Sequence, residues 1–424
     1  DSETLISDVF QLPKAHFAIF DISLNELILK QYWHIPKYEN SSASLSSLTT
    51  ELDLLLMESI KKQTECEVPF GVFLSGGVDS SLLTYYASKN SSEKIKTFHI
   101  SFPGYEQLNE SKYAKLVSEI CGTDHFELDG GIINFKMIKE LIKNFSDPIA
   151  DSSILPTFLV SKLTSQKVKV AIGGDGGDEL FGGYETYSRI LKLNPISKKI
   201  PKIFFNLIKL LAGFLPLGFK GRNFLMTIEK TAQDSFLSNR LFDDFSIKKT
   251  LKNKSLKSKD SKRFSSNDLI YFFTRNDFNN YLTSNILKKV DRCSMANSLE
   301  VRAPFLDKKI IEFAFRNVPS NFKANKNESK IILKELLKSK IGEKLNLNRK
   351  QGFSIPIHDW INNKWHADVK AELKKLPESL FNIDFVIKML EDNKKGCSNS
   401  SRIFSLVVLS LWLNEYKIKI CRLL

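Results

Sequence analysis

The sequence predicts an α/β protein in which a parallel sheet is flanked by helices and a largely helical C-terminal part follows. Short apolar segments alternate with segments of helical pattern between residues 46 and 190, which is typical of parallel sheets with crossover helices. Two of these apolar segments end in clusters of glycine, and the pattern beyond residue 190 is mostly helical. The chain has 424 residues, 42% of them hydrophobic, which is enough to bury the cores of two or three domains.

The N-terminal region predicts little independent structure. Residues 1–40 contain two short strand-like segments, Phe17–Asp21 and Leu27–Trp33, and two short strands do not make a stable domain. This region therefore looks like the end of a larger unit. Residues 41–50 are rich in serine and predict a linker, and Leu48–Lys62 has the apolar spacing of an amphipathic helix.

The next apolar segment, Phe70–Leu74, predicts a buried strand that ends in a glycine turn. Ser75-Gly76-Gly77 lets the backbone turn sharply and approach a ligand. Asp79 and Ser80 then begin a helix. A strand, a glycine turn and a helix N-terminus together favour an anion site. No lysine follows Gly77, so this is not a Walker loop, and Asp79 stands where a cation ligand would be.

Further strands and helices follow in alternation up to the second glycine cluster. In parallel sheets ligands bind at the carboxyl ends of the strands, where both glycine clusters fall. The predicted strands are Ile95–Phe102, His125–Leu128 and Val168–Ile172, and the predicted helices are Asn109–Cys121, Ile133–Phe145 and Ile154–Leu163.

The second glycine cluster is Gly173–Tyr184, which carries three carboxylates, Asp175, Asp178 and Glu179. These would repel one another unless a cation or a basic group lay between them. Magnesium takes one or two carboxylates together with phosphate oxygens, so Asp79 and one of these residues could share such an ion. The alternative is a surface turn with solvated acids.

Beyond residue 190 three segments attract attention. Ile196–Leu215 is apolar and basic; it predicts a packed helix, with a membrane-surface helix as the less favoured alternative. Residues 288–307 combine poor apolar spacing with Asp291, Arg292, Glu300 and Arg302, which predicts buried charges in an ion-pair network or a substrate site. Lys350 lies in a glycine turn; without further information it could equally be a surface lysine.

The composition limits the partners. The formal net charge of +14 suggests nucleic acid, but the lysines are scattered and the densest run, Lys248–Lys262, predicts a solvated loop. We expect no nucleic-acid partner. Five cysteines without a Cys-x-x-Cys pair indicate neither zinc nor disulfides and favour the cytoplasm. No run of about 18 apolar residues predicts a membrane span, and we expect no membrane partner. The start at Asp1, without a signal peptide pattern, suggests a fragment.

Four motifs in order resemble one family, the synthetase domain of glutamine-hydrolysing asparagine synthetases, which are pyrophosphate-loop ATPases. The resemblance runs from about residue 10 to about residue 370. It implies a five-stranded sheet of the adenine nucleotide α-hydrolase type. It also implies that residues 1–45 are the remnant of a glutaminase domain with its linker, 46–190 the ATP-binding core and 191–424 the helical part of the synthetase domain. The motifs are Ser75–Ser80, Gly173–Tyr184, Val290–Asp307 and Lys350–Phe353.

The resemblance also implies an activity: ATP adenylates the side-chain carboxylate of aspartate, and ammonia, derived from glutamine in the full-length enzyme, displaces AMP to give asparagine. Mg²⁺ would bind Asp79 and Asp178. Lys350 would stabilise the developing charge, and Asp175 would hold the substrate ammonium or accept a proton. A homodimer stays open. The residues expected around ATP are Leu74, Ser75, Gly76, Gly77, Asp79, Ser80, Ile100, Gly173 and Gly174.

Some positions depart from the family pattern. Gly173 stands where many relatives carry serine, and Asp175 where glutamate is common. The glutaminase nucleophile is an N-terminal cysteine, but residue 1 is Asp1, which puts glutamine use in doubt for this chain. The alternatives are an adenylating amidotransferase that acts on another carboxylate, of a surface polysaccharide or secondary metabolite, or a tRNA-modifying pyrophosphate-loop enzyme.

Overall fold

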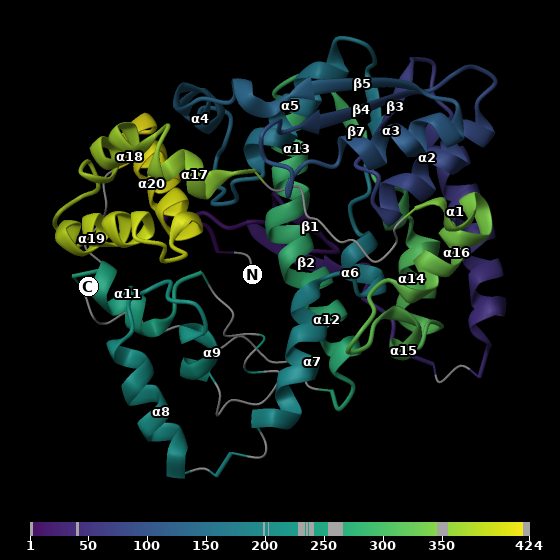
Figure 1. Cartoon of the computed structure of the whole chain (residues 1–424). Helices are drawn as coiled ribbons and strands as arrows, with labels where there is room; N and C mark the ends of the chain where they lie inside the picture. The colour runs from purple at the N-terminus through teal and green to yellow at the C-terminus, as the bar shows by residue number, and fades with distance from the viewer. Residues whose placement is uncertain are drawn as a thin grey trace.

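The structure is a computed structural model of the chain. It describes residues 3–39, 42–197, 200–201, 203–227, 234, 236, 241–252, 266–345 and 355–418. Helices surround a central sheet, and a separate hairpin lies near the N-terminus (Figure 1). Lys350 and the rest of its predicted motif lie outside the described residues.

The central sheet has five parallel strands, which confirms the predicted fold class. The strands are β3 (Phe70–Phe73), β4 (Lys96–Ser101), β5 (Asp124–Asp129), β6 (Val170–Ile172) and β7 (Glu300–Arg302). Their order is β5-β4-β3-β6-β7. The chain moves outward from β3 to β5 and then returns to the other side of β3. A topological switch point therefore lies between β3 and β6, where open α/β sheets bind ligands.

The edge strand β7 was not predicted as a strand. It has three residues, two of them charged, and no alternation that marks a strand. It pairs with β6 in parallel, Ala171 opposite Val301. The sheet therefore draws a strand from the part of the chain beyond residue 190.

Helices cover both faces of the sheet, and each face has its own apolar core (Figure 1). On one face, Phe98 and Ile100 of β4 belong to the same buried cluster as Leu155 on one flanking helix. On the other face, Val72 of β3 is buried in a cluster with Leu82. The flanking elements are α1 (Leu45–Thr64), α2 (Val78–Asn90), α3 (Ser111–Cys121), η1 (Gly130–Ile132), α4 (Phe135–Ile142), α5 (Ile154–Ser165) and α6 (Gly177–Phe181).

The linker predicted for residues 41–50 is wrong for its second half, because α1 begins at Leu45. The side chain of Ser44 accepts a hydrogen bond from the backbone N–H of Ser47 and caps the helix. The serines are thus a helix start rather than a loop, a role that serine favours at an N-cap.

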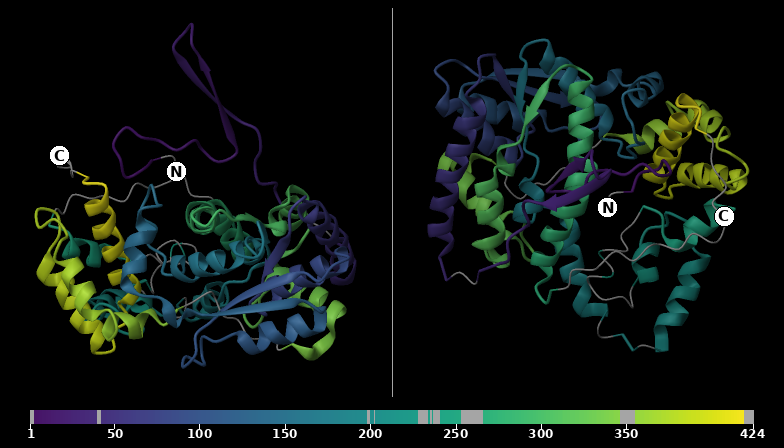
Figure 2. Two further views of the ribbon diagram at one scale, coloured as in Figure 1. Left: turned by 90° about the horizontal axis from the view of Figure 1, so that it is seen from above. Right: turned by 180° about the vertical axis from the view of Figure 1, so that it is seen from behind.

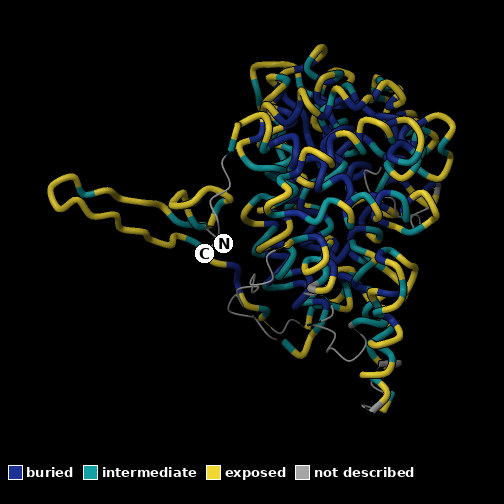
Figure 3. Tube along the Cα trace, turned by 90° about the vertical axis from the view of Figure 1, so that its left-hand side faces the viewer, coloured by how far each residue is buried: buried dark blue, intermediate teal, exposed yellow. Residues whose placement is uncertain are grey.

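The N-terminal strands are β1 (His16–Asp21) and β2 (Glu26–Gln31), which pair with each other as an antiparallel hairpin. The hairpin stands away from the body of the chain (Figure 2) and is exposed along most of its length (Figure 3). Phe20 and Leu27, opposite each other, are both exposed. The expectation that the two strands are part of a larger unit stays a prediction.

The remainder is helical, as predicted, within the part of the chain that the structure describes. None of its helices is long and apolar enough to cross a membrane. Its elements are α7 (Glu185–Ser197), α8 (Ile203–Phe214), α9 (Arg222–Thr227), α11 (Asp244–Thr250), α12 (Leu269–Asp277), the π-helix η2 (Phe278–Ile286), α13 (Leu287–Met295), η3 (Pro304–Leu306), α14 (Lys308–Arg316), α15 (Ser320–Lys323), α16 (Ile331–Ile341), η4 (Gly342–Lys344), α17 (Ile357–Asn362), α18 (His366–Leu373), α19 (Ile383–Lys394) and α20 (Ser400–Glu415).

Two expectations for this helical part are wrong. The helix α8 is not packed on all sides, because much of its apolar surface is exposed. The charges predicted to be buried between residues 288 and 307 are instead at or near the surface: the side chains of Asp291 and Arg292 are 62% and 50% exposed. Arg302 binds Glu300 at 2.7 Å. Poor apolar spacing here reflects a short helix followed by an edge strand.

Candidate functional site

The first glycine loop joins β3 to the N-terminus of α2 and is held by its own hydroxyl groups. The backbone N–H of Ser75 donates to Ser80 Oγ at 3.2 Å, and that of Gly77 donates to Ser75 Oγ at 3.3 Å. Gly76 has a φ of +76°, and a Cβ there would lie 2.6 Å from the backbone of Tyr113 on α3. Only glycine fits this position. The loop thus presents the first amides of α2, which suit an anion.

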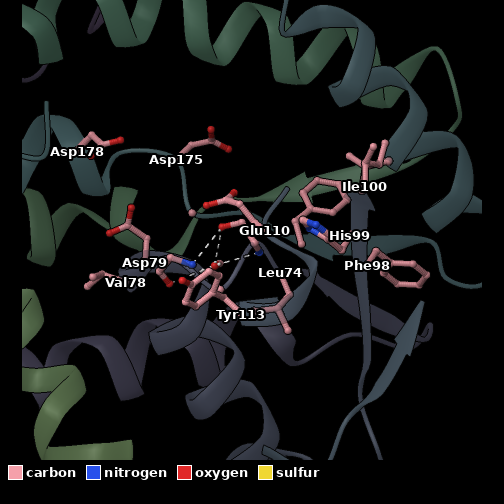
Figure 4. A pocket seen from close by; sticks show the side chains of 18 of the residues that line it. Leu74, Val78, Asp79, Phe98, His99, Ile100, Glu110, Tyr113, Asp175 and Asp178 are labelled. Atoms are coloured by element: carbon pink, nitrogen blue, oxygen red, sulfur yellow. Dashed lines mark hydrogen bonds between the residues drawn. The ribbon is translucent and has the colours of Figure 1, made fainter. Parts of the chain in front are cut away.

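The second glycine segment follows β6 and lies against the start of α2. A Cβ on Gly177 would lie 2.7 Å from Cγ of Asp79, so the backbone touches that carboxylate directly. The next residue is Asp178. Figure 4 shows Asp79, Asp175 and Asp178 around one end of a cavity. The two glycine clusters therefore bring carboxylates from two strand ends into one place.

A lysine lies between two of these carboxylates. The ammonium of Lys330, the residue before α16, binds Asp79 and lies 2.8 Å from Asp178. Its side chain is only 9% exposed. Although burial disfavours the charged form, Asp178 and Asp79 raise the pKa of Lys330 above its ordinary value. The expectation of a cation or basic group between the acids is thus met by Lys330.

Asp175 lines the same cavity as Asp79 and Asp178 (Figure 4). Burial raises the pKa of its carboxyl, and Lys289 on α13 partly opposes that effect. The ammonium of Lys289 donates to Ser153 Oγ at 2.8 Å and lies 3.4 Å from Asp151. Although burial of Asp151 works the other way, Lys289 and Ser153 hold the pKa of that carboxyl below its usual range. A cation thus faces Asp175 across the cavity.

The other end of the cavity is lined by the ends of β3 and β4. Leu74, His99 and Ile100 lie there, with Phe98 beside them (Figure 4). The cavity of about 270 Å³ therefore has an acidic end with glycine loops and a more apolar end. Such a cavity suits a ligand with a flat apolar group and a charged tail.

Eleven of the twelve predicted site residues line this one cavity, and the twelfth, Lys350, lies outside the described residues. Their individual roles stay predictions. The eleven are Leu74, Ser75, Gly76, Gly77, Asp79, Ser80, Ile100, Gly173, Gly174, Asp175 and Asp178.

Several residues of the cavity had no role predicted from the sequence. Lys330 belongs to no predicted motif, and Lys289 lies in the segment 288–307, just before the motif that begins at Val290. Conversely, Arg302 and Glu300, which were candidates for a substrate site, do not line the cavity. Arg302 donates instead to the backbone oxygen of Gln63 at 2.8 Å. The other lining residues without a predicted role include His99, Glu110, Tyr113 and Lys334.

A glycine loop at a helix N-terminus, at the switch point of a parallel sheet, defines the class of nucleotide-binding α/β proteins. The comparisons with known proteins identify the family. The asparagine synthase family model matches residues 51–414. The chain belongs to this family, which confirms the resemblance found in the sequence.

Individual relatives of the chain carry names that agree with this family. The chain is 30% identical to asparagine synthetase [glutamine-hydrolyzing] 1 of Bacillus subtilis, over 87% of this chain and 61% of the relative. It is 27% identical to a putative asparagine synthetase [glutamine-hydrolyzing] of Mycobacterium tuberculosis, over 97% of this chain and 65% of the relative. The chain thus spans about three fifths of the length of the curated relatives it matches.

Proposed function

We propose that this chain is the synthetase part of an asparagine-forming ligase: it adenylates the side-chain carboxylate of aspartate and transfers ammonia to it. The observation that carries this proposal is the meeting of both glycine loops and the three aspartates Asp79, Asp175 and Asp178 in one cavity. Family membership supports the reaction class.

The residues at the two ends of the cavity favour one orientation of ATP. The adenine would lie at the end formed by Leu74 and Ile100, and the phosphates would lie over Ser75 to Gly77 and the first amides of α2. Gly173 and Gly174 would border the phosphates from the second loop. The phosphate tail then ends beside Asp79 and Asp178.

The two carboxylates fit a magnesium ion bound together with phosphates. Within the described residues no group of three or more His, Cys, Asp or Glu side chains is placed to hold a metal. Mg²⁺ does not need one, because it commonly takes one or two carboxylates, phosphate oxygens and water. Asp79 and Asp178 both line the cavity and already share one cation, the ammonium of Lys330. Bound there, Mg²⁺ would neutralise charge on the leaving pyrophosphate.

The proposed reaction has two steps, adenylation of the carboxylate and formation of the amide. A carboxylate oxygen of aspartate attacks the α-phosphorus, the bond to the bridging oxygen breaks, and pyrophosphate leaves. Ammonia then attacks the acyl carbon, the bond to AMP breaks, and the nitrogen loses a proton. Asp175 suits the acceptor of that proton because its pKa is raised by burial. Lys350 would stabilise the phosphoryl charge as it develops.

Lys289 is our candidate for recognition of the amino-acid substrate. Its ammonium lines the cavity and keeps a firm hydrogen bond to Ser153, but its ion pair with Asp151 is long, at 3.4 Å. A carboxylate of the substrate would complete its contacts. We assign it to the α-carboxylate of aspartate, which does not react.

The ammonia source and the setting are inferred from the wider family. The matched relatives are named glutamine-hydrolyzing, and we propose that the exposed hairpin at residues 16–31 belongs to a glutaminase domain of a longer polypeptide. Residues 46–190 would form the ATP-binding core and 191–424 complete the synthetase domain. The four cysteines that the structure describes are free thiols, which supports a cytoplasmic setting.

The test is a product analysis of the chain with ATP, Mg²⁺, aspartate and an ammonium salt. We expect AMP, pyrophosphate and asparagine in equal amounts, each dependent on aspartate. ATP cleaved to ADP, or AMP formed without dependence on any carboxylate, would refute the proposal. AMP formed only with a different carboxylate would keep adenylation but reject aspartate.

A further inference from the structure

The helix α8 exposes a stripe of large apolar side chains. Phe204, Leu207, Leu211 and Phe214 are between 50% and 80% exposed. Their spacing of three, four and three residues places them on one face of the helix. On another side Ala212 is buried. The stripe is therefore a continuous apolar surface, unlike the single exposed hydrophobics that any protein carries.

The same part of the chain is strongly basic. Residues 186–228 contain eight lysines and arginines and no aspartate or glutamate. That is a charge of +8, against +14 for the whole chain. One of the eight, Arg222, is buried and pairs with Asp243 at 2.8 Å. The other seven lie before, within and after the apolar stripe in the sequence, and no acidic residue lies between them.

The length of α8 restricts how it could contact a membrane. Twelve residues of α-helix are about 18 Å long, well short of the roughly 30 Å of a bilayer core. The helix lies at the edge of the molecule, away from the central sheet (Figure 1, Figure 2). It could lie in the plane of a membrane interface but could not cross one.

We propose that α8 docks on an anionic membrane surface, with its apolar stripe in the interface and the net positive charge of segment 186–228 attracted to the headgroups. Apolar side chains and basic residues together favour this occupant, because each supplies one of the two attractions that hold an interfacial helix. A second copy of the chain is disfavoured, since self-association would bring together two segments that each carry seven basic residues besides the paired Arg222. This proposal does not depend on the proposed reaction.

The test is sedimentation of the purified chain with vesicles. Phosphatidylcholine vesicles are compared with vesicles that also contain phosphatidylglycerol. We expect binding to the anionic vesicles, weakened by salt. A variant with Phe204→Ser, Leu207→Ser, Leu211→Ser and Phe214→Ser should bind at least about tenfold more weakly, since one buried side chain of this size is worth about that factor.

A matched control removes two phenylalanines and two leucines from another exposed surface: Phe17→Ser, Phe20→Ser, Leu27→Ser and Leu29→Ser on the hairpin. It should bind anionic vesicles like the unaltered chain. Both variants should keep the denaturation midpoint of that chain, because all eight side chains are exposed. The proposal is overturned if the unaltered chain binds no anionic vesicle, if the α8 variant binds equally well, or if light scattering shows that the α8 variant only dissociates a dimer.

Discussion

Replacing Lys330 by methionine would remove the cation between Asp79 and Asp178 while keeping the length of the side chain. The two carboxylates would then face each other without compensation, in a place where their side chains are only 17% and 28% exposed. Removing one partner of a buried ion pair costs about 3 to 5 kcal/mol. Because water partly screens these carboxylates, we expect the lower end, about 3 kcal/mol of the free energy of unfolding.

The same helix offers the control. Lys338 on α16 binds Glu343 at 2.5 Å, but their side chains are 52% and 77% exposed. Such a surface pair is worth at most about 1 kcal/mol. Lys338→Met should therefore cost clearly less than Lys330→Met, although the chemical change is identical.

Urea unfolding at neutral pH, without and then with Mg²⁺, measures both effects. Without Lys330, a bound magnesium ion could take its place between the two carboxylates, so Mg²⁺ should stabilise Lys330→Met more than the unaltered chain. A stability loss no larger than that of Lys338→Met would contradict the buried ion-pair geometry. Equal stabilisation of both proteins by Mg²⁺ would contradict a metal site at these two carboxylates.

Three further outcomes are expected. Asp79→Asn and Asp178→Asn should each lower pyrophosphate release by about 100-fold or more with an unchanged circular dichroism spectrum; normal turnover would reject them as metal ligands. Lys289→Met should lower kcat/KM for aspartate by about 10- to 150-fold but leave the turnover of β-alanine, which lacks the α-carboxylate, unaffected. The control variant Lys288→Met should change neither value. Equal losses with both substrates would reject the assigned contact between Lys289 and the α-carboxylate. Burial lowers the pKa of Lys323 from 10.5 to about 7. The destabilisation caused by the buried cation is therefore largest below pH 7 and disappears as the pH rises to 10.5. Lys323→Met should therefore gain most stability in urea unfolding near pH 6.5 and lose that gain toward pH 10, and a constant difference would contradict this.

The strand ends and glycine loops could be predicted because their signals are local. Phe70–Leu74 followed by Ser75-Gly76-Gly77 reads as a strand, a turn and a helix start within a dozen residues. The carboxylates of Gly173–Tyr184 were found in the same way. Both loops end strands of one parallel sheet, which is why the eleven described residues meet in one cavity.

The features that sequence reasoning missed depend on contacts between distant parts of the chain. Lys330 is 251 residues from Asp79, and nothing in its own neighbourhood distinguishes it from the other lysines. β7 is a strand only because β6 is there to pair with it. The exposure of α8 follows from tertiary packing, since its sequence is apolar enough to be buried.

Lys330 also explains why the site can exist before any ligand binds. The chain order of the strands places Asp79 and Asp178 beside each other at the switch point between β3 and β6, and two carboxylates this close destabilise a fold unless a cation compensates them. A lysine from α16 supplies that charge from the same polypeptide. An ammonium is bound by reversible ion pairs, so it can shift toward incoming phosphate oxygens when a divalent cation takes over the carboxylates. On this reasoning Lys330 stabilises the protein without a ligand, and we expect it to contact the phosphates if ATP and Mg²⁺ bind as proposed.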